Sequence, residues 1–162
     1  MKKVRLTILV IVTIIFANNV SAFDPNDLQK LKKTGSCEKC NLSNAELVKF
    51  KSKEANLANA NLKSANIYYA LLEKANLAGA NLEGANLANA YLLGAKLNNA
   101  NLKGADLTGA YLRNVNLTAS NLRNVNLSGA NLKAADLGYA LMNGAILCNT
   151  IMPDGSVIYS GC

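Results

Sequence analysis

Apolar residues recur along most of this chain with a period of five. If Leu57 is taken as the centre of a unit, a centre follows at every fifth residue as far as Leu147, and 17 of these 19 centres are Leu. The residue two places before the centre is Ala in 16 of the 19 units. Asn or Asp usually stands between them. The exceptions are Ile67 and Met142 at the centre, and Val115, Ser120 and Val125 at the Ala position.

A period of five fits neither common secondary structure. An amphipathic helix repeats its apolar residues at intervals of three and four, and a half-buried strand repeats them at intervals of two. Frequent Asn and Gly also lower the helix propensity. The pattern instead predicts a chain that turns a corner at every unit, with Leu and Ala inward and the other three positions facing water. Because one unit cannot bury its own Leu, the units must stack on one another.

The repeated Ala-Asn/Asp-Leu-x-x unit closely resembles the pentapeptide-repeat family. Weaker units extend the repeat back to Cys40 through Leu42 and Leu47. The resemblance implies an all-β fold, a right-handed quadrilateral β-helix in which four of these units form each coil. Residues 40–152 hold 23 units, which make between five and six coils. With coils about 4.8 Å apart, the rod should be about 25 Å long.

The residue that follows each centre gives separate support for four sides. In alternate units this residue is charged in eight of nine cases, and in the eight units between them it is never charged. A period of ten places the charges on two opposite faces of a four-sided rod, whereas a three-sided rod would mix the two types in every column. The charged residues are Lys53, Lys63, Glu73, Glu83, Lys103, Arg113, Arg123 and Lys133, and Leu93 is the exception.

Both flanks of the repeat predict structures that cover its ends. In the segment 23–39, Asp24 and Pro25 suit the N-cap and first turn of a short capping helix, and Gly35 suits its end. In the segment 153–162, Pro153-Asp154-Gly155 follows Met152 and is typical of a turn. Residues 157–159 are then expected to fold back as a short strand over the last coil.

Residues 1–22 are typical of a secretory signal peptide. Three basic residues precede an apolar run at 6–17, and Val20-Ser21-Ala22 provides small residues for cleavage before Phe23. A run of this length is short for a membrane span, which needs about 20 residues. We therefore expect an exported protein, periplasmic or secreted, with no membrane span after cleavage. An uncleaved anchor is the alternative.

The four cysteines of an exported chain favour disulfides. In the rod implied by the resemblance, Cys37 and Cys40 lie more than about 20 Å from Cys148 and Cys162. A disulfide needs α-carbons within about 7 Å, so we expect Cys37–Cys40 and Cys148–Cys162. The first pair is also a C-x-x-C motif, which is typical of a redox pair. The thioredoxin-like context of such a motif is missing, and a structural clip is the favoured interpretation.

Charge and composition exclude several kinds of chemistry. The formal net charge is +7, but three basic residues and no acid lie in 1–22, which leaves +4 in the mature chain. Such a charge tolerates an anionic partner without requiring one. The chain has no His, which removes the commonest general base and metal ligand. The few acids are scattered, and a packed rod leaves no pocket. We expect no enzyme, no catalytic residue, no metal site and no cofactor.

One column of apolar residues is a candidate binding surface. Leu71, Tyr91 and Tyr111 stand just before the centre, and each is four units from the next, so they should stack on one face. Leu93 should lie beside them and Arg113 at their edge. An exposed strip of this kind can mark a partner site. A ladder between coils that only stabilises the rod is the alternative.

The charged faces become basic toward the C-terminal half of the repeat. Lys103, Arg113, Arg123 and Lys133 form a candidate patch for an anionic partner. The alternative is that they are solvated faces that keep the rod soluble.

Taken together, these features predict a non-catalytic binding or structural scaffold protein of the cell envelope, present as a monomer. Its partner would be an unknown protein or an anionic envelope component, and not nucleic acid. The resemblance also raises DNA mimicry toward a topoisomerase, but such mimics are strongly acidic and cytoplasmic. A thiol redox protein that uses its C-x-x-C pair is a further alternative.

Overall fold

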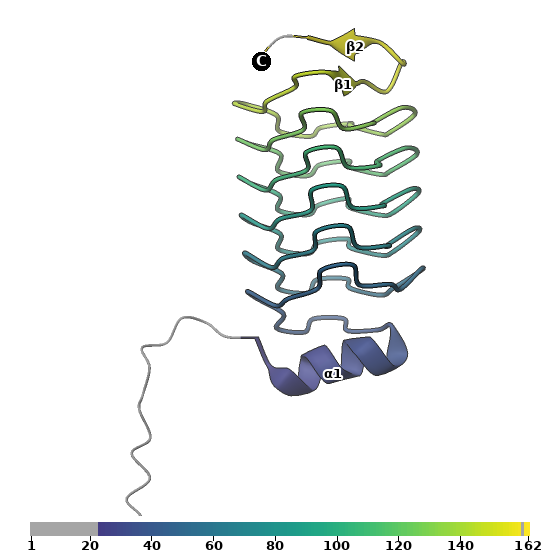
Figure 1. Ribbon diagram of the computed structural model, residues 1–162, viewed down its shortest axis with the longest axis vertical. Helices are drawn as coiled ribbons and strands as arrows, with labels where there is room; N and C mark the ends of the chain where they lie inside the picture. The colour runs from purple at the N-terminus through teal and green to yellow at the C-terminus, as the bar shows by residue number, and fades with distance from the viewer. Residues whose placement is uncertain (1–22, 160) are drawn as a thin grey trace, which may run out of the picture.

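The computed structural model describes residues 23–159, 161 and 162, so the predicted signal peptide lies outside the described residues. The elements, in chain order, are helix α1 (Pro25–Thr34), strand β1 (Thr150–Ile151) and strand β2 (Val157–Ile158). Between α1 and β1 the chain forms a stack of coils, with α1 at one end of the stack and the two strands at the other (Figure 1).

The bridges between neighbouring coils show how much of the chain one turn takes. Every isolated parallel bridge, from Ser36↔Asn56 to Asn131↔Ile151, joins residues whose numbers differ by 20. Each coil is bonded to both of its neighbours: the amide of Asn76 donates to the carbonyl of Ala55 at 2.8 Å, and the amide of Leu77 donates to the carbonyl of Lys96 at 2.7 Å. Four units therefore complete one turn, as the charge pattern predicted, and the rod has four faces.

The corners of the coil explain the frequent Gly and Asn. The second residue after each centre has a positive φ, for example 56° at Asn59 and 67° at Gly79. The amide of Ala60 donates to the carbonyl of Leu57 at 3.1 Å, which closes a four-residue turn. The second residue of this turn, Ala58, has no positive φ. A positive φ at the third residue only is typical of a type II turn, which favours Gly or Asn there. At Gly79 a Cβ would also collide with the side chain of Asn59, one coil earlier.

The predicted core is confirmed. The centres from Leu57 to Leu132 are at most 1% exposed, and the Ala residues beside them are equally buried. Val115 and Val125 fill the same inward position without becoming exposed. Ser120 is also fully buried, and its hydroxyl donates to the carbonyl of Leu117 at 2.7 Å. The polar atom is therefore satisfied inside an otherwise apolar interior.

The prediction that three positions in every unit face water was wrong for the Asn position. These side chains are half-buried because their oxygens accept from their own backbone two residues on, as Asn101 does from the amide of Lys103 at 3.2 Å. On one face they also form a ladder, in which each Nδ2 donates to the Oδ1 one coil earlier at 3.1–3.3 Å. The ladder consists of Asn41, Asn61, Asn81, Asn101 and Asn121.

The predicted helix is present and begins and ends where the sequence indicated. The side chain of Asp24 accepts from the amide of Asn26 at 2.8 Å, and Gly35 ends the helix with a φ of 68°. Leu31 is fully buried, and the amide of Asp24 donates to the carbonyl of Asn41 at 2.9 Å. The helix thus lies directly against the first coil (Figure 1).

The C-terminal turn and strand are also present. The amide of Gly155 donates to the carbonyl of Met152 at 2.9 Å, and β2 pairs antiparallel with β1. The strand covers residues 157–158, so Tyr159 lies outside it. Beneath this hairpin the last centres, Leu137, Met142 and Leu147, are only partly buried, whereas those one coil earlier are fully buried. The hairpin therefore covers only part of the last coil.

Both predicted disulfides are formed, Cys37–Cys40 and Cys148–Cys162. The first is buried, with Cys37 at 0% and Cys40 at 5% exposure, whereas Cys162 is exposed. The second closes a loop with a sequence separation of 14. A loop of this length contributes about 3 kcal/mol to the free energy of unfolding in the chain-entropy model.

We expect Leu102→Ala to lower the free energy of unfolding by about 2–5 kcal/mol, because it leaves a cavity between two neighbouring coils. Leu137→Ala is the matched control: Leu137 is already partly exposed in the last coil, so it should lose less. Chemical denaturation followed by circular dichroism measures both. Equal losses would mean that the interior is not a continuous column of Leu.

We expect a mild thiol reductant to reduce Cys148–Cys162 before Cys37–Cys40, because Cys37 and Cys40 are buried where α1 meets the first coil. Alkylation of the freed thiols followed by mass spectrometry measures the order. Leu31→Ala should loosen α1 and speed the reduction of Cys37–Cys40 alone. Faster reduction of the buried pair in the unmodified chain would show that α1 does not protect it.

Candidate functional site

The predicted strip of apolar side chains is assembled on one face of the rod. Parallel bridges join Leu71 to Tyr91 and Tyr91 to Tyr111. The two tyrosine rings stack, with centroids 4.4 Å apart and planes 12° from parallel. Leu93 and Arg113 follow the centres of the same units, so they lie in the neighbouring column. We call Leu71, Tyr91, Leu93, Tyr111 and Arg113 the Tyr/Leu strip.

The strip is most accessible from solvent at Leu93 and toward its C-terminal end. Tyr111 is 45% exposed and Leu93 is 42% exposed, whereas Leu71 and Tyr91 are half-buried. Along the rest of the rod the position of Tyr91 is mostly held by Asn. Stacked rings explain part of the strip as a ladder between coils. The stack does not account for Leu93, which is not part of it. Leu93 occupies the position after the centre, which is charged in the other eight units of its alternating set.

Tyr91 holds its proton more tightly than an ordinary tyrosine. A hydrogen bond with the side chain of Tyr111 raises the pKa of Tyr91 above its usual value, and the charge that Tyr111 would carry raises it further. Desolvation and the charge of nearby Tyr69 act in the same direction. The raised pKa keeps the Tyr91 phenol protonated to higher pH than the phenol of an ordinary tyrosine.

Sequence reasoning missed two residues beside the strip. Tyr68 and Tyr69 lie at the corner just before Leu71, and their rings meet edge to face with centroids 4.6 Å apart. Tyr69 is 38% exposed and close enough to Tyr91 to affect its pKa. The signal was available, because two adjacent tyrosines occupy positions that are otherwise polar or small. The two tyrosines were missed because the comparison covered residues one coil apart and did not cover residues on adjoining faces.

The charged columns contain the ion pairs that a coil of four units implies. Lys53 lies 2.8 Å from Glu73, and Lys63 lies 3.5 Å from Glu83. A hydrogen bond with Glu73 raises the pKa of Lys53 above its usual value. The lysines are exposed and the glutamates are partly exposed, so each pair contributes little to stability. The pairs do show which charges of the two columns are neutralised by a neighbour.

The four residues of the candidate anionic-partner patch are exposed but lie in two columns. Lys103 and Arg123 are one coil apart on one face, and Arg113 and Lys133 are one coil apart on the opposite face. They therefore form two pairs and not one continuous patch. None of the four makes a salt bridge with any residue that the structure describes.

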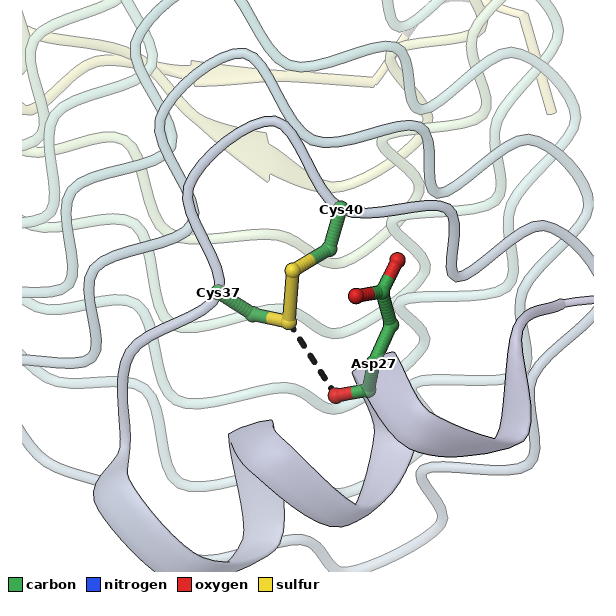
Figure 2. A group of neighbouring side chains, drawn as sticks. All are labelled: Asp27, Cys37 and Cys40. Atoms are coloured by element: carbon green, nitrogen blue, oxygen red, sulfur yellow. Dashed lines mark hydrogen bonds between the residues drawn. A yellow bond between two sulfur atoms is a disulfide. The ribbon is translucent and has the colours of Figure 1, made fainter.

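Asp27, Cys37 and Cys40 gather where α1 meets the first coil (Figure 2). Their ligand-type atoms lie within 4.8 Å of one another. The sulfurs are bonded to each other and so offer no thiolate to a metal. The carboxylate of Asp27 accepts from the amide of Asn41 at 2.7 Å. The Sγ of Cys37 lies 3.1 Å from the carbonyl oxygen of Asp27; a disulfide sulfur carries no hydrogen, so this is a close contact that joins the helix to the coil.

The described part of the chain offers surfaces and no cavity. No pocket was found among residues 23–159, 161 and 162. Within the same residues, no helix is long and apolar enough to cross a bilayer.

Comparison with known proteins places the chain in one family. The family model "Pentapeptide repeats" matches residues 40–79, 75–114 and 110–149. Among solved structures, the chain is similar to HetL, a pentapeptide-repeat protein involved in the regulation of heterocyst differentiation in the cyanobacterium Nostoc sp. strain PCC 7120. The identity is 31%, the TM-score is 0.53, and the match covers 76% of this chain and 66% of HetL. No curated protein matches.

Two further structures are similar over shorter or weaker matches. A pentapeptide-repeat protein of the Arabidopsis thaliana thylakoid lumen is 33% identical, with a TM-score of 0.39 and coverage of 59% of each chain. QnrB1, a plasmid-mediated fluoroquinolone resistance protein, is 18% identical over 78% of this chain and 75% of its own, with a TM-score of 0.26. The chain spans less than two thirds of the length of HetL and of the Arabidopsis protein.

The family model, the five-residue period and the coil of four units agree, and the chain belongs to the pentapeptide-repeat family.

Proposed function

We propose that this chain is an exported, non-catalytic binding protein of the cell envelope that contacts a partner protein through the Tyr/Leu strip. The observation that carries the proposal is the stacked Tyr91–Tyr111 pair with exposed Leu93 beside it. Tyrosine and Arg are enriched where partner proteins are bound tightly. The rings are held by neighbouring coils, so little conformational entropy is lost on binding.

The flat face around the strip favours a partner protein over a small molecule. A small ligand needs a concave site that buries most of its surface, and the described residues form none. A rigid face with half-exposed Leu93 and Tyr111 and with Arg113 at its edge matches the apolar centre and polar rim of a small protein interface. No catalytic residue or cofactor is part of this proposal.

We also propose that α1 and the C-terminal hairpin act as caps for a right-handed coil of five to six turns. Support comes from Leu31, which is buried against the first coil, and from β2, which pairs with the last one. Open ends of a solenoid expose unpaired backbone groups and promote aggregation, so capped ends are consistent with a monomer.

Export rests on the pattern of residues 1–22 and is consistent with the two disulfides, which persist in oxidising compartments. DNA mimicry is disfavoured because the mature chain is basic, and the weak similarity to QnrB1 carries no argument for it. The C-x-x-C pair is buried beneath α1, which does not suit thiol exchange with another protein.

We expect the mature protein to begin at Phe23 and to be found outside the cytoplasm with both disulfides formed. Cell fractionation, N-terminal sequencing and alkylation of free thiols measure this. A variant in which two residues of the apolar run are changed, Leu9→Arg and Ile11→Arg, should remain in the cytoplasm. Unprocessed wild-type chain in the cytoplasm with four free thiols would contradict the export proposal.

We expect the double variant Tyr91→Ala, Tyr111→Ala to lose its partner in crosslinking and pull-down experiments from its own envelope fraction. Tyr91→Phe, Tyr111→Phe keeps the stacked rings and should keep most of the binding. Tyr139→Ala is the matched control, because Tyr139 is 93% exposed and lies away from the strip. An unchanged set of partners together with lost stability would show that the stack is only a structural ladder.

A further inference from the structure

The order of positive and negative charges in the two charged columns changes halfway along the rod. In the N-terminal half the sign alternates from coil to coil, and Lys53 and Lys63 are each paired with a Glu one coil later. In the C-terminal half the same sign repeats. We call Lys103 with Arg123 the first cation doublet and Arg113 with Lys133 the second.

The members of each doublet are separated by one coil. Neighbouring coils lie about 4.8 Å apart, so two positive charges stand almost directly above one another. Like charges opposite one another on paired strands are destabilising. All four side chains are exposed, and no acid among the described residues forms a salt bridge with them. A bound anion would relieve this repulsion.

One acid stands in the column of the first doublet. Glu83 lies one coil before Lys103, but its carboxylate pairs with Lys63 on its other side at 3.5 Å. In the column of the second doublet the corresponding neighbour is Leu93, which has no charge.

Two further acids lie on the adjoining faces and already have other partners. Asp106 accepts from the amide and the hydroxyl of Thr108 at 2.9 and 2.6 Å. Asp136 accepts from the amide of Gly138 at 2.9 Å. Both carboxylates are oriented by their own segments of backbone, and neither forms an ion pair with a doublet.

Asp154 lies near Lys133, because the amide of Ala134 donates to the carbonyl of Pro153 at 2.9 Å. Its carboxylate accepts from the amide and the hydroxyl of Ser156 at 2.9 and 2.6 Å and forms no ion pair with a doublet.

The two doublets face in opposite directions. They are offset by half of a coil, and the packed column of Leu lies between them. A linear molecule that lies on one doublet cannot reach the other without wrapping around the rod. The C-terminal half of the rod therefore carries two separate cationic sites, one on each side.

We propose that the rod crosslinks two segments of a linear phosphate polymer, with one segment on each doublet. The Arg of each doublet can donate two parallel hydrogen bonds to a phosphate, and the Lys adds a point charge beside it. The oxygens of a phosphate group point in several directions, so one group can contact both cations. This interaction goes beyond the protein partner proposed above. Arg113 borders both surfaces, but the doublets do not need the tyrosine rings.

The test uses the full mature chain with inorganic polyphosphate as the probe. Titration calorimetry with short polyphosphate counts the sites, and light scattering with long polyphosphate measures crosslinking. Lys103→Gln, Arg123→Gln removes the first doublet, and Arg113→Gln, Lys133→Gln removes the second.

The matched control is Lys53→Gln, Lys74→Gln. It also removes two positive charges, but from positions that are already paired with Glu, at 2.8 Å from Glu73 and at 4.0 Å from Glu54. It leaves the pair of Lys63 with Glu83 intact, so that Glu83 is not released toward the first doublet.

We expect the unmodified chain to bind two short segments and to crosslink long polyphosphate. Each doublet variant should lose one of the two sites and should no longer crosslink. The control should bind and crosslink as the unmodified chain does, apart from a small general effect of net charge. The affinity of each site should fall as the salt concentration rises, because phosphate binding releases counterions.

Several outcomes would overturn the proposal. One is an equal loss of crosslinking in the control, which would show that net charge alone is responsible. Others are a doublet variant that still crosslinks, and polyglutamate that crosslinks as well as polyphosphate. The variant Tyr91→Ala, Tyr111→Ala keeps both doublets and should still crosslink, so a failure of the protein-partner proposal is distinguished from a failure of this one.

Discussion

The structure depends on one constraint: after every four units the chain must return to the same place, so that its backbone bonds to the coils on either side. The left-handed residue in every unit makes this possible, because it turns the chain by one corner without breaking the bonds between coils. Leu and Ala are buried only as a result of this return. A single coil would leave its Leu side chains open on both sides, and so the apolar pattern stabilises the stack and not the individual unit.

The same constraint organises the surface. Residues one coil apart become neighbours, so the outer faces consist of columns whose members interact as cross-strand pairs do. This is why two tyrosines far apart in the sequence stack ring on ring, why Lys53 meets Glu73, and why the asparagines form a ladder. It also exposes the ends of the rod. Helix α1 covers the first coil closely through Leu31, whereas the hairpin of β1 and β2 leaves Leu137 and Met142 partly open.

The interior of the rod is filled by side chains, so both proposed interactions use its outer faces. Two features of those faces depart from the pattern around them. The Tyr/Leu strip places apolar and aromatic groups where other units have Asn or a charge, and the two doublets repeat a charge that the N-terminal half neutralises. The first suits a protein surface and the second an anionic polymer. They share Arg113 but rest on different groups, so either interaction can exist without the other.

The sequence by itself determined the five-residue period, the inward positions, the helix from Asp24 to Gly35, the C-terminal turn and the stacking of Tyr91 on Tyr111. These depend on local turn chemistry and on a repeat that places the same residue type in the same contact in every coil. The tertiary structure alone decided that the Asn side chains are half-buried, that Tyr69 lies beside Tyr91, and that Lys103, Arg113, Arg123 and Lys133 form no salt bridge with any described residue. These outcomes depend on distances around a corner and between coils, which residue types and their spacing do not specify.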